Sequence, residues 1–169
     1  MSLRVEALDD RHELASFSCG NLELDRWLRD HARQATAQGT RTYIVLDDED
    51  HDAVVGYFAI VPHVLDRGDA PPKLGRGAPR QIPSILLAKL ALSDDLHGQG
   101  LGAELLVRAL DTIIDAARIA GGKLVVVDAI DADAEAFYRH HDFQPLPNRS
   151  DRLVMKLSTS ARALGKDWP

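Results

Sequence analysis

The chain has little cysteine, no long apolar run and no excess of positive charge. Cys19 is its one cysteine, so it can form no internal disulfide and no cysteine cage for zinc. No apolar stretch approaches the ~20 residues that cross a bilayer, and the N-terminal stretch MSLRVEALDDRHEL has no apolar signal core. With 20 Lys and Arg against 26 Asp and Glu, the net charge of −6 disfavours a generic basic nucleic-acid-binding protein. These absences predict a cytoplasmic protein without a membrane segment or a metal site.

The composition that remains is that of a globular protein. Hydrophobic residues make up 45% and charged residues 27% of the 169 positions, which is ordinary for such a protein. A chain of this length fits one domain, and no internal repeat is visible in it. We expect a single domain over residues 1–157, followed by a C-terminal tail over residues 158–169 whose weak periodicity predicts a frayed end.

Hydrophobic periodicity and turn residues predict an α/β fold. The expected order is β, α, ββ, a long loop, β, α, β, α, β, in which a helix joins the fourth and fifth strands as a crossover unit. The expected strands are Leu3–Ala7, Thr40–Asp47, Ala53–Val64, Ser84–Ser93, Leu124–Ala129 and Arg152–Leu157. The expected helices run from Asn21 to Thr36, from the Gly98–Gly102 segment to Ala120, and from Asp131 or Asp133 to His141.

Two segments concentrate basic residues. In the first expected helix, an apolar face holds Leu24, Trp27, Leu28, His31 and Ala35, and the opposite face holds Arg26, Arg29 and Arg33. Because Asp25 and Asp30 lie between these arginines, a solvated face of mixed charge is the alternative to a binding face. The expected loop over residues 66–83 contains four of the eight prolines and carries Arg67, Lys73, Arg76 and Arg80. Loops of this length are more often functional than idle.

Three alternating glycines stand between the fourth expected strand and the helix that follows it. Gly98, Gly100 and Gly102 let the backbone approach a ligand without Cβ atoms in the way. The unpaired N–H groups and the dipole at such a helix start bind phosphate oxygens. The segment is not a Walker A loop, because no Gly-Lys-Ser/Thr follows, and its place after the fourth strand makes it a poor dinucleotide fingerprint. An ordinary glycine-rich turn is the alternative.

This segment resembles the acetyl-coenzyme A loop of the GNAT acetyltransferase family, which reads Gln/Arg-x-x-Gly-x-Gly/Ala. Gly100 and Gly102 match the two small positions, whereas His97 stands where Gln or Arg is usual. A second segment, DADAEAFYRHHDF, resembles the family's fourth helix, with Tyr138 on the family's tyrosine and Asp142 in place of its glycine.

A subfamily resemblance covers roughly residues 5–157. The segments FSCGNLELDRWLRDHA, VVGYFAIVP, IPSILLAKLAL and VVVDAIDADAEAFY resemble GNAT toxins of bacterial toxin–antitoxin pairs. The resemblance implies the GNAT fold, a central mixed and mostly antiparallel sheet that is flanked by helices and has splayed fourth and fifth strands. It implies acetyl-CoA as cofactor, acetyl transfer to the α-amine of aminoacyl-tRNA, which blocks translation, a small ribbon-helix-helix antitoxin and a homodimer.

The resemblance also implies the site residues. Tyr138 is the expected general acid for the leaving thiolate, since a phenol with an ordinary pKa of about 10 keeps its proton at pH 7; core packing beside Phe137 is the alternative. The expected cofactor-binding residues are Leu90, Ala91, Leu92, His97, Gly98, Gln99, Gly100, Leu101, Gly102, Ala103 and Asp131. The tRNA surface does not come from the resemblance: if tRNA is the substrate, the two basic segments are the best candidates to contact its phosphates. The expected tRNA-binding residues are therefore Arg26, Arg29, Arg33, Arg76 and Arg80.

Other residues have two interpretations each. Lys89, charged within an apolar strand, forms an ion pair or extends its stem along apolar surface, or else contacts a tRNA phosphate or the substrate. No general base is evident among His63, His97 and His140, and Cys19 is expected to be structural. The alternatives for the whole protein are a GNAT enzyme for a small amine or a protein N-terminus, and a GNAT-like protein that binds coenzyme A or a partner without catalysis.

Overall fold

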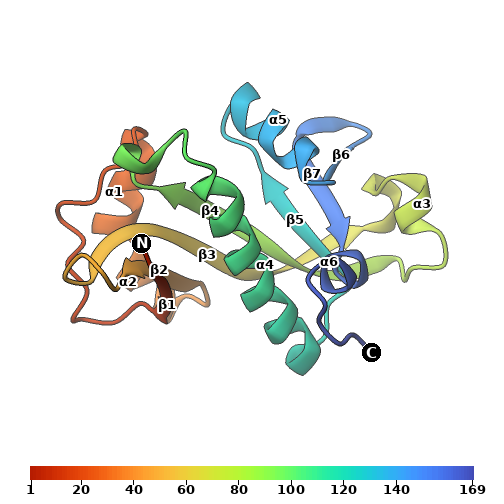
Figure 1. Cartoon of the computed structure of the whole chain (residues 1–169). Helices are drawn as coiled ribbons and strands as arrows, with labels where there is room; N and C mark the ends of the chain where they lie inside the picture. The colour runs from red at the N-terminus through yellow and green to blue at the C-terminus, as the bar shows by residue number, and fades with distance from the viewer. The chain divides into compact units, whose positions relative to one another are not determined.

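The computed structural model describes all residues, Met1–Pro169, and contains one seven-stranded sheet with the order β1-β2-β3-β4-β5-β7-β6 (Figure 1). The strands are β1 (Leu3–Ala7), β2 (Arg41–Asp47), β3 (Ala53–Asp66), β4 (Gln81–Leu92), β5 (Leu124–Asp128), β6 (Gln144–Leu146) and β7 (Arg149–Lys156). The helices are α1 (Leu22–Asp30), α2 (Ala32–Ala37), α3 (Pro72–Gly75), α4 (Leu101–Ala120), α5 (Ala132–His140) and α6 (Leu157–Ala163), with 3₁₀ turns η1 (Arg67–Asp69) and η2 (Asp94–Leu96). The mixed, mostly antiparallel sheet is the expected fold class.

Contacts divide the chain into two compact units. Unit 1 comprises Met1–Val61 and Ala88–Ala109, and unit 2 comprises Pro62–Leu87 and Leu110–Pro169. No helix in the chain is both long enough and apolar enough to span a membrane.

Unit 1 is built on the β2–β3 hairpin that the sequence predicts. β1 pairs antiparallel with β2, and β2 pairs antiparallel with β3. The acidic turn of the hairpin closes through His51 and Asp52, whose φ angles of 51° and 57° are left-handed. Beneath α1, a core cluster buries Leu14, Phe17, Cys19, Leu24, Leu28, Ala32, Ile44, Leu46, Tyr57 and Ala91.

The single helix expected over residues 21–36 is wrong, because the chain forms two helices. Asn21 caps α1 as expected, since its side chain accepts a hydrogen bond from the Leu24 N–H. The helix then breaks at His31, whose φ of −126° is not helical, and α2 starts at the next residue. The break moves His31 out of the expected apolar face to an exposed position. Asp25, which the mixed-charge alternative places in solvent, is buried.

Unit 2 contains the parallel pair of the sheet. β4 pairs parallel with β5 over Ser84–Leu87 and Leu124–Val127, and β7 pairs antiparallel with both β5 and β6. α5 leads into β6 and β7 along this part of the sheet (Figure 1). A core cluster beneath these strands buries Leu65, Ala70, Leu74, Ala78, Ile82, Leu124, Val126, Leu146 and Val154.

Two expectations about irregular segments are wrong. The loop expected over residues 66–83 is largely ordered structure: β3 extends to Asp66, β4 begins at Gln81, and η1 and α3 lie between them. The segment is part of unit 2 and packs into its core cluster through buried Leu74, and the Arg67 guanidinium donates to the Ala78 carbonyl at 3.0 Å. The tail is not frayed, because α6 follows β7 directly and buries Leu157 and Ala161. That residues 1–157 form one domain stays a prediction.

Candidate active site

The glycine segment forms the turn between β4 and α4 in unit 1. Gly98 and Gly100 have φ angles of 78° and 76°, in the left-handed region that favours glycine. A Cβ added at either position would meet nothing within 4 Å, so the surface over the turn is open. The N–H groups of Gly98, Gln99 and Gly100 donate no backbone hydrogen bond in the turn, and the first N–H groups of α4 have no partner within the helix. An open surface with unpaired donors at the start of a long helix is suited to bind phosphate oxygens.

Side chains hold this turn against its neighbours. The His97 ring lies with Nε2 2.9 Å from the Leu92 carbonyl oxygen at the end of β4, to which it donates. The Ser18 hydroxyl donates to Asp94 at 3.0 Å, and the Asp94 N–H donates to the Ser18 carbonyl. His97 was expected to be the first residue of the loop that donates to the cofactor. In the structure its ring instead donates to the Leu92 carbonyl and holds the loop against β4.

The end of β4 lies beyond the parallel ladder. The pairing with β5 ends at Leu87 and Val127, whereas β4 continues through Ala88 to Leu92. Within this extension Ala91 is buried, and Leu90 and Leu92 are half-buried. The extension leads directly into η2 and the glycine turn, so the expected cofactor residues of β4 and of the turn are consecutive parts of unit 1.

Tyr138 lies near the C-terminal end of α5 in unit 2. Its ring is 6% exposed and packs edge-to-face against Phe137 and Phe143, with ring centroids 5.4 Å away in both cases. Burial, and secondarily the charge of Asp128, raises the pKa of its hydroxyl above the ordinary value of 10.0. No protein group forms a hydrogen bond with this hydroxyl. The phenol is thus protonated at neutral pH, and no acceptor within the protein engages its proton.

A cluster of polar side chains that sequence reasoning did not assemble lies near Tyr138. Arg152 donates to both carboxylate oxygens of Asp128, at 2.6 and 2.8 Å, and its Nη1 lies 3.4 Å from Nε2 of His63. Burial, and secondarily Arg152, lowers the pKa of His63, so its ring is neutral at pH 7. Asp128 and Arg152 are register partners in the β5–β7 ladder, and only the pairing of the strands could have revealed this.

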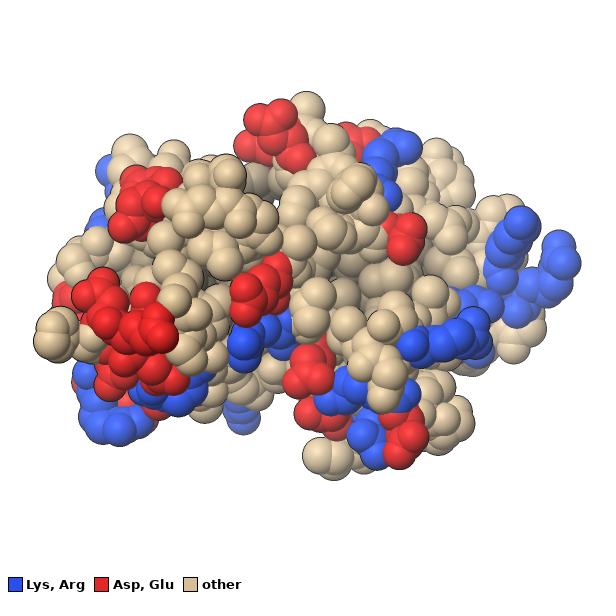
Figure 2. Space-filling model, in the orientation of Figure 1, with Lys and Arg blue, Asp and Glu red and all other residues tan.

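The expected tRNA-binding arginines fall into different settings. Arg26 and Arg29 are exposed on α1 and have no ion-pair partner. Arg76 and Arg80 are exposed in the segment after α3, and Lys73 is exposed within α3 itself. Figure 2 shows basic side chains gathered over α3 at the right of the view. Arg26 and Arg29 belong to unit 1, whereas Arg76 and Arg80 belong to unit 2.

Comparison with known proteins identifies the family. The sequence profile of the acetyltransferase (GNAT) domain matches residues 38–145, which is more than half of the chain. The chain belongs to the GNAT acetyltransferase family. It is similar to the tRNA-acetylating toxin of Mycobacterium tuberculosis, with 35% identity over 93% of this chain and 93% of that protein.

Two solved GNAT toxins are also similar to this chain. AtaT complexed with acetyl-methionyl-tRNAfMet is 28% identical, with a TM-score of 0.86, and the match covers 98% of this chain and 100% of AtaT. A tyrosine-to-phenylalanine mutant of AtaT, bound to the C-terminus of the antitoxin AtaR and acetyl-CoA, is 26% identical, with a TM-score of 0.81 and coverage of 98% and 100%.

Two departures from the GNAT pattern have structural explanations. Asp142 follows α5 with a φ of 71°, so it adopts the left-handed conformation that the usual glycine would adopt. Asp131, an expected cofactor residue, uses its carboxylate to cap α5, because Oδ1 accepts from the Ala134 N–H at 2.8 Å. A cofactor role for Asp131 stays a prediction, and one of its oxygens is already engaged.

Cys19 is a structural residue of this GNAT chain, as expected. Its side chain lies in the core cluster of unit 1, and its N–H donates to the buried Asp25 carboxylate at 2.9 Å. Burial, and secondarily Asp25, raises the pKa of the Cys19 thiol to about 12. A thiol with such a pKa carries almost no thiolate at pH 7, so it cannot serve as a nucleophile.

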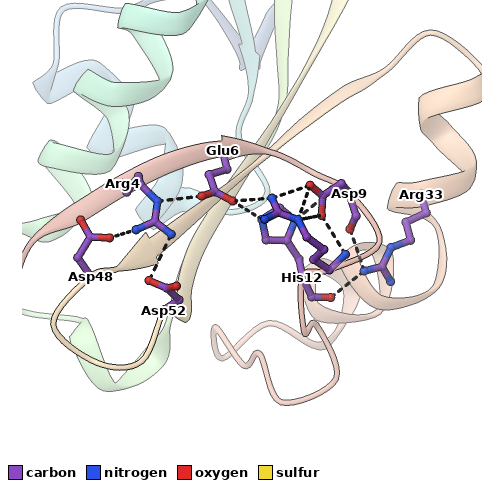
Figure 3. Close-up of polar contacts among 8 residues, drawn as sticks. Arg4, Glu6, Asp9, His12, Arg33, Asp48 and Asp52 are labelled. Carbon is purple, nitrogen blue, oxygen red and sulfur yellow. Dashed lines mark hydrogen bonds and ion pairs between the residues drawn. The ribbon is translucent and has the colours of Figure 1, made fainter.

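Arg33 belongs to a polar network rather than to a free basic face. Its Nη2 donates to the carbonyl oxygens of Asp9 and His12, at 3.2 and 2.8 Å (Figure 3). The network continues through the His12 ring to Glu6, whose Oε1 lies 2.9 Å from Nε2. Because the Asp9 N–H donates to Nδ1 of His12, the ring presents its Nε2–H to Glu6. Arg33 thus fastens the segment after β1 to α2.

Replacement Arg33→Gln should therefore lower the free energy of unfolding by about 1 kcal/mol, since it removes two partly exposed hydrogen bonds to carbonyl groups. Arg26→Gln removes an exposed, unpaired cation from the neighbouring helix and should leave stability within about 0.5 kcal/mol of wild type. Urea denaturation of both variants measures the difference. Equal stability of the two variants would contradict the anchoring role of Arg33.

Proposed function

We propose that this chain is an acetyl-CoA-dependent N-acetyltransferase toxin, which transfers an acetyl group to the α-amine of aminoacyl-tRNA and thereby blocks translation. The observation that carries the proposal is the 35% identity to a tRNA-acetylating toxin over 93% of both chains. The similarity to AtaT, solved with acetyl-methionyl-tRNAfMet and with acetyl-CoA, supports the same substrate and cofactor. The open glycine turn and the unpaired Tyr138 hydroxyl are the features that this chemistry requires.

Acetyl transfer of this kind is a direct displacement. Acetyl-CoA supplies the acetyl thioester; the amine nitrogen of the acceptor forms a bond to the carbonyl carbon, and the carbon–sulfur bond breaks. Tyr138 donates its hydroxyl proton to the sulfur that leaves, the amine nitrogen releases one proton to water as the amide forms, and the Tyr138 phenolate regains a proton from water. The α-amine of an amino acid ester has a lower pKa than an alkylamine because the ester withdraws electrons. A fraction of the amine is then neutral at pH 7, and no dedicated base is needed.

The remaining roles fall to the backbone of unit 1. The unpaired N–H groups between Gly98 and Gly102, with Ala103 behind them in α4, bind the pyrophosphate oxygens of the cofactor. The backbone of Leu90, Ala91 and Leu92 holds the pantetheine arm, and one N–H of this extension stabilises the oxyanion that develops on the thioester carbonyl. Such a donor contributes roughly 3 kcal/mol to transition-state stabilisation in enzymes that use one.

The deciding experiment incubates the protein with acetyl-CoA and charged total tRNA. Mass spectrometry of the aminoacyl groups released from the tRNA should find N-acetylated amino acids, and uncharged tRNA should give none. Parallel reactions contain small amines and peptides with free N-termini. Acetylation of those substrates without acetylation of charged tRNA would replace the proposal with a small-amine or N-terminal acetyltransferase. Cofactor binding without any transfer would make the chain a non-catalytic member.

The tRNA surface predicts a change that depends on the substrate. The double replacement Arg26→Glu with Arg29→Glu should lower kcat/KM on charged tRNA at least tenfold. The slope of log(kcat/KM) against the logarithm of the salt concentration should become less steep by about two, one for each lost phosphate contact. Activity on an amino acid methyl ester should stay within twofold of wild type, because that substrate reaches only the reaction centre.

The matched variant carries Arg76→Glu with Arg80→Glu, which places the same charge change in unit 2. If only this second variant loses activity on charged tRNA, the segment after α3 is the one that binds the tRNA backbone. Equal losses on tRNA and on the methyl ester would mean that α1 supports the fold rather than the tRNA.

The partners follow from the same relatives. We propose that a small ribbon-helix-helix antitoxin binds this chain, since AtaT was solved with its antitoxin AtaR. We propose further that the protein is a homodimer and that it acts in the cytoplasm, where charged tRNA is found. Co-expression with a candidate antitoxin, followed by gel filtration with light scattering, tests both the complex and the dimer.

A further inference from the structure

Lys89 is the one charged residue of β4, and it lies next to the segment proposed to hold the thioester. Side chains alternate along a strand, so Lys89 shares its face of β4 with Ala91. Ala91 packs in the unit 1 core cluster beneath α1, which places Lys89 on the α1 side of the strand. The residue is half-buried rather than extended into solvent.

An aromatic platform holds the Lys89 ammonium group. Nζ lies 5.5 Å from the centroid of the Trp27 ring, within the range of a cation–π contact. Trp27 stacks on Tyr57, with ring centroids 6.0 Å apart and an interplanar angle of 11°. The Tyr57 hydroxyl donates to the Leu24 carbonyl at 2.7 Å, which fixes the platform to α1. The position of the ammonium is thus set by packing.

No carboxylate forms an ion pair with Lys89, although partly buried cations in proteins usually find one. A cation–π contact leaves the three N–H donors of an ammonium free for an anion. Lys89 is therefore a positioned cation without an anion, one residue before Leu90. The extended strand places it within about 10 Å of Leu92, at about 3.3 Å per residue.

The proposed acceptor, aminoacyl-tRNA, carries a phosphate close to the amino group that would be acetylated. In aminoacyl-tRNA the amino acid is esterified to the terminal ribose, and the 5′-phosphate of that nucleotide is one sugar away from the ester. We propose that Lys89 binds this terminal 5′-phosphate and so positions the aminoacyl group for acetyl transfer. The inference rests on the proposed function and adds the phosphate as a recognition element at the reaction centre.

The test compares a 3′-aminoacyl adenosine that carries a 5′-phosphate with one that lacks it, alongside charged tRNA. The wild-type enzyme should acetylate the phosphorylated form about tenfold more efficiently in kcat/KM, and Lys89→Gln should lose this preference. Lys89→Gln should also lower kcat/KM on charged tRNA about tenfold and reduce its salt slope by about one. Lys89→Arg should restore most of the preference, because it keeps the charge.

Matched controls separate the phosphate from folding and from the cofactor. Lys123→Gln removes an exposed lysine of unit 2 and should leave every substrate unaffected. The thermal midpoint of Lys89→Gln should fall by only a few degrees, because the variant loses one cation–π contact, and its KM for acetyl-CoA should match wild type. An equal loss on both adenosine substrates, a raised KM for acetyl-CoA or a wild-type enzyme indifferent to the phosphate would overturn the assignment of Lys89. Failure of the wild type to acetylate charged tRNA would instead overturn the proposed function, and the assignment with it.

Discussion

Replacement of Tyr138 by phenylalanine should lower kcat on the order of 10²-fold or more and leave the Kd for acetyl-CoA within a few fold of wild type. The variant removes only a hydroxyl that has no hydrogen-bond partner in the protein, and the phenyl ring keeps its packing against Phe137 and Phe143. Steady-state kinetics on charged tRNA and calorimetry with acetyl-CoA measure the two quantities. In cells, wild-type expression without antitoxin should halt growth, and expression of the variant should not.

Tyr43→Phe is the matched control for this substitution. Tyr43 stacks on Phe58 in unit 1, and its hydroxyl also has no hydrogen-bond partner, so the control removes the same group away from α5. The control should retain wild-type turnover and toxicity. Turnover of Tyr138→Phe near that of wild type would make Tyr138 a packing residue and would leave protonation of the thiolate to water. Because burial raises the Tyr138 pKa, kcat should show no alkaline decline from this group below about pH 10.

Replacement of Gly100 by aspartate should abolish measurable binding of acetyl-CoA. The new carboxylate would stand at the open turn where the pyrophosphate oxygens are proposed to bind. Two unit charges 4 Å apart repel by about 4 kcal/mol at an effective dielectric constant of 20, so Kd should rise on the order of 10²-fold or more. Isothermal titration calorimetry with acetyl-CoA measures the loss, and thermal denaturation checks the fold.

Two further variants isolate the charge from the strain of the backbone. Gly100→Ala imposes the same left-handed φ of 76° on a side chain without adding charge, and it should weaken binding far less. Gly77→Asp introduces an aspartate at an equally open glycine with the same φ, in the segment after α3. It should bind acetyl-CoA as wild type does. If Gly100→Asp binds acetyl-CoA with unchanged affinity, the phosphates of the cofactor do not bind at this turn.

The sequence predicted correctly those elements that are determined by residues close together in the chain. The stripe of α4, with Leu105, Leu106, Ala109, Ile113 and Ile114, is buried as its spacing predicts. The caps Asn21 and Asp131 accept the hydrogen bonds that their positions predict. The glycine spacing predicted a turn before α4, and the structure has this turn, with left-handed φ angles at Gly98 and Gly100.

Features that depend on partners distant in the sequence could not be predicted. The pairing of Asp128 with Arg152 depends on the β5–β7 register, and the contacts of Arg33 depend on the path of the chain after β1. The break at His31 occurs in a stretch whose periodicity continues across it, so tertiary contacts override the helical pattern. The segment over residues 66–83 was predicted as a loop because proline and glycine dominate its composition. Burial of Leu74 and Ala78 orders it nevertheless.

The position of β7 has a consequence for the biosynthesis of the protein. β7 lies between β5 and β6 in unit 2, yet it is the last strand of the chain to leave the ribosome. β5 and β6 therefore cannot join one sheet, and Asp128 cannot pair with Arg152, until residues 149–156 have emerged. The helix α5, which carries Tyr138 and contacts β7, therefore acquires this support only after β7 has been synthesised.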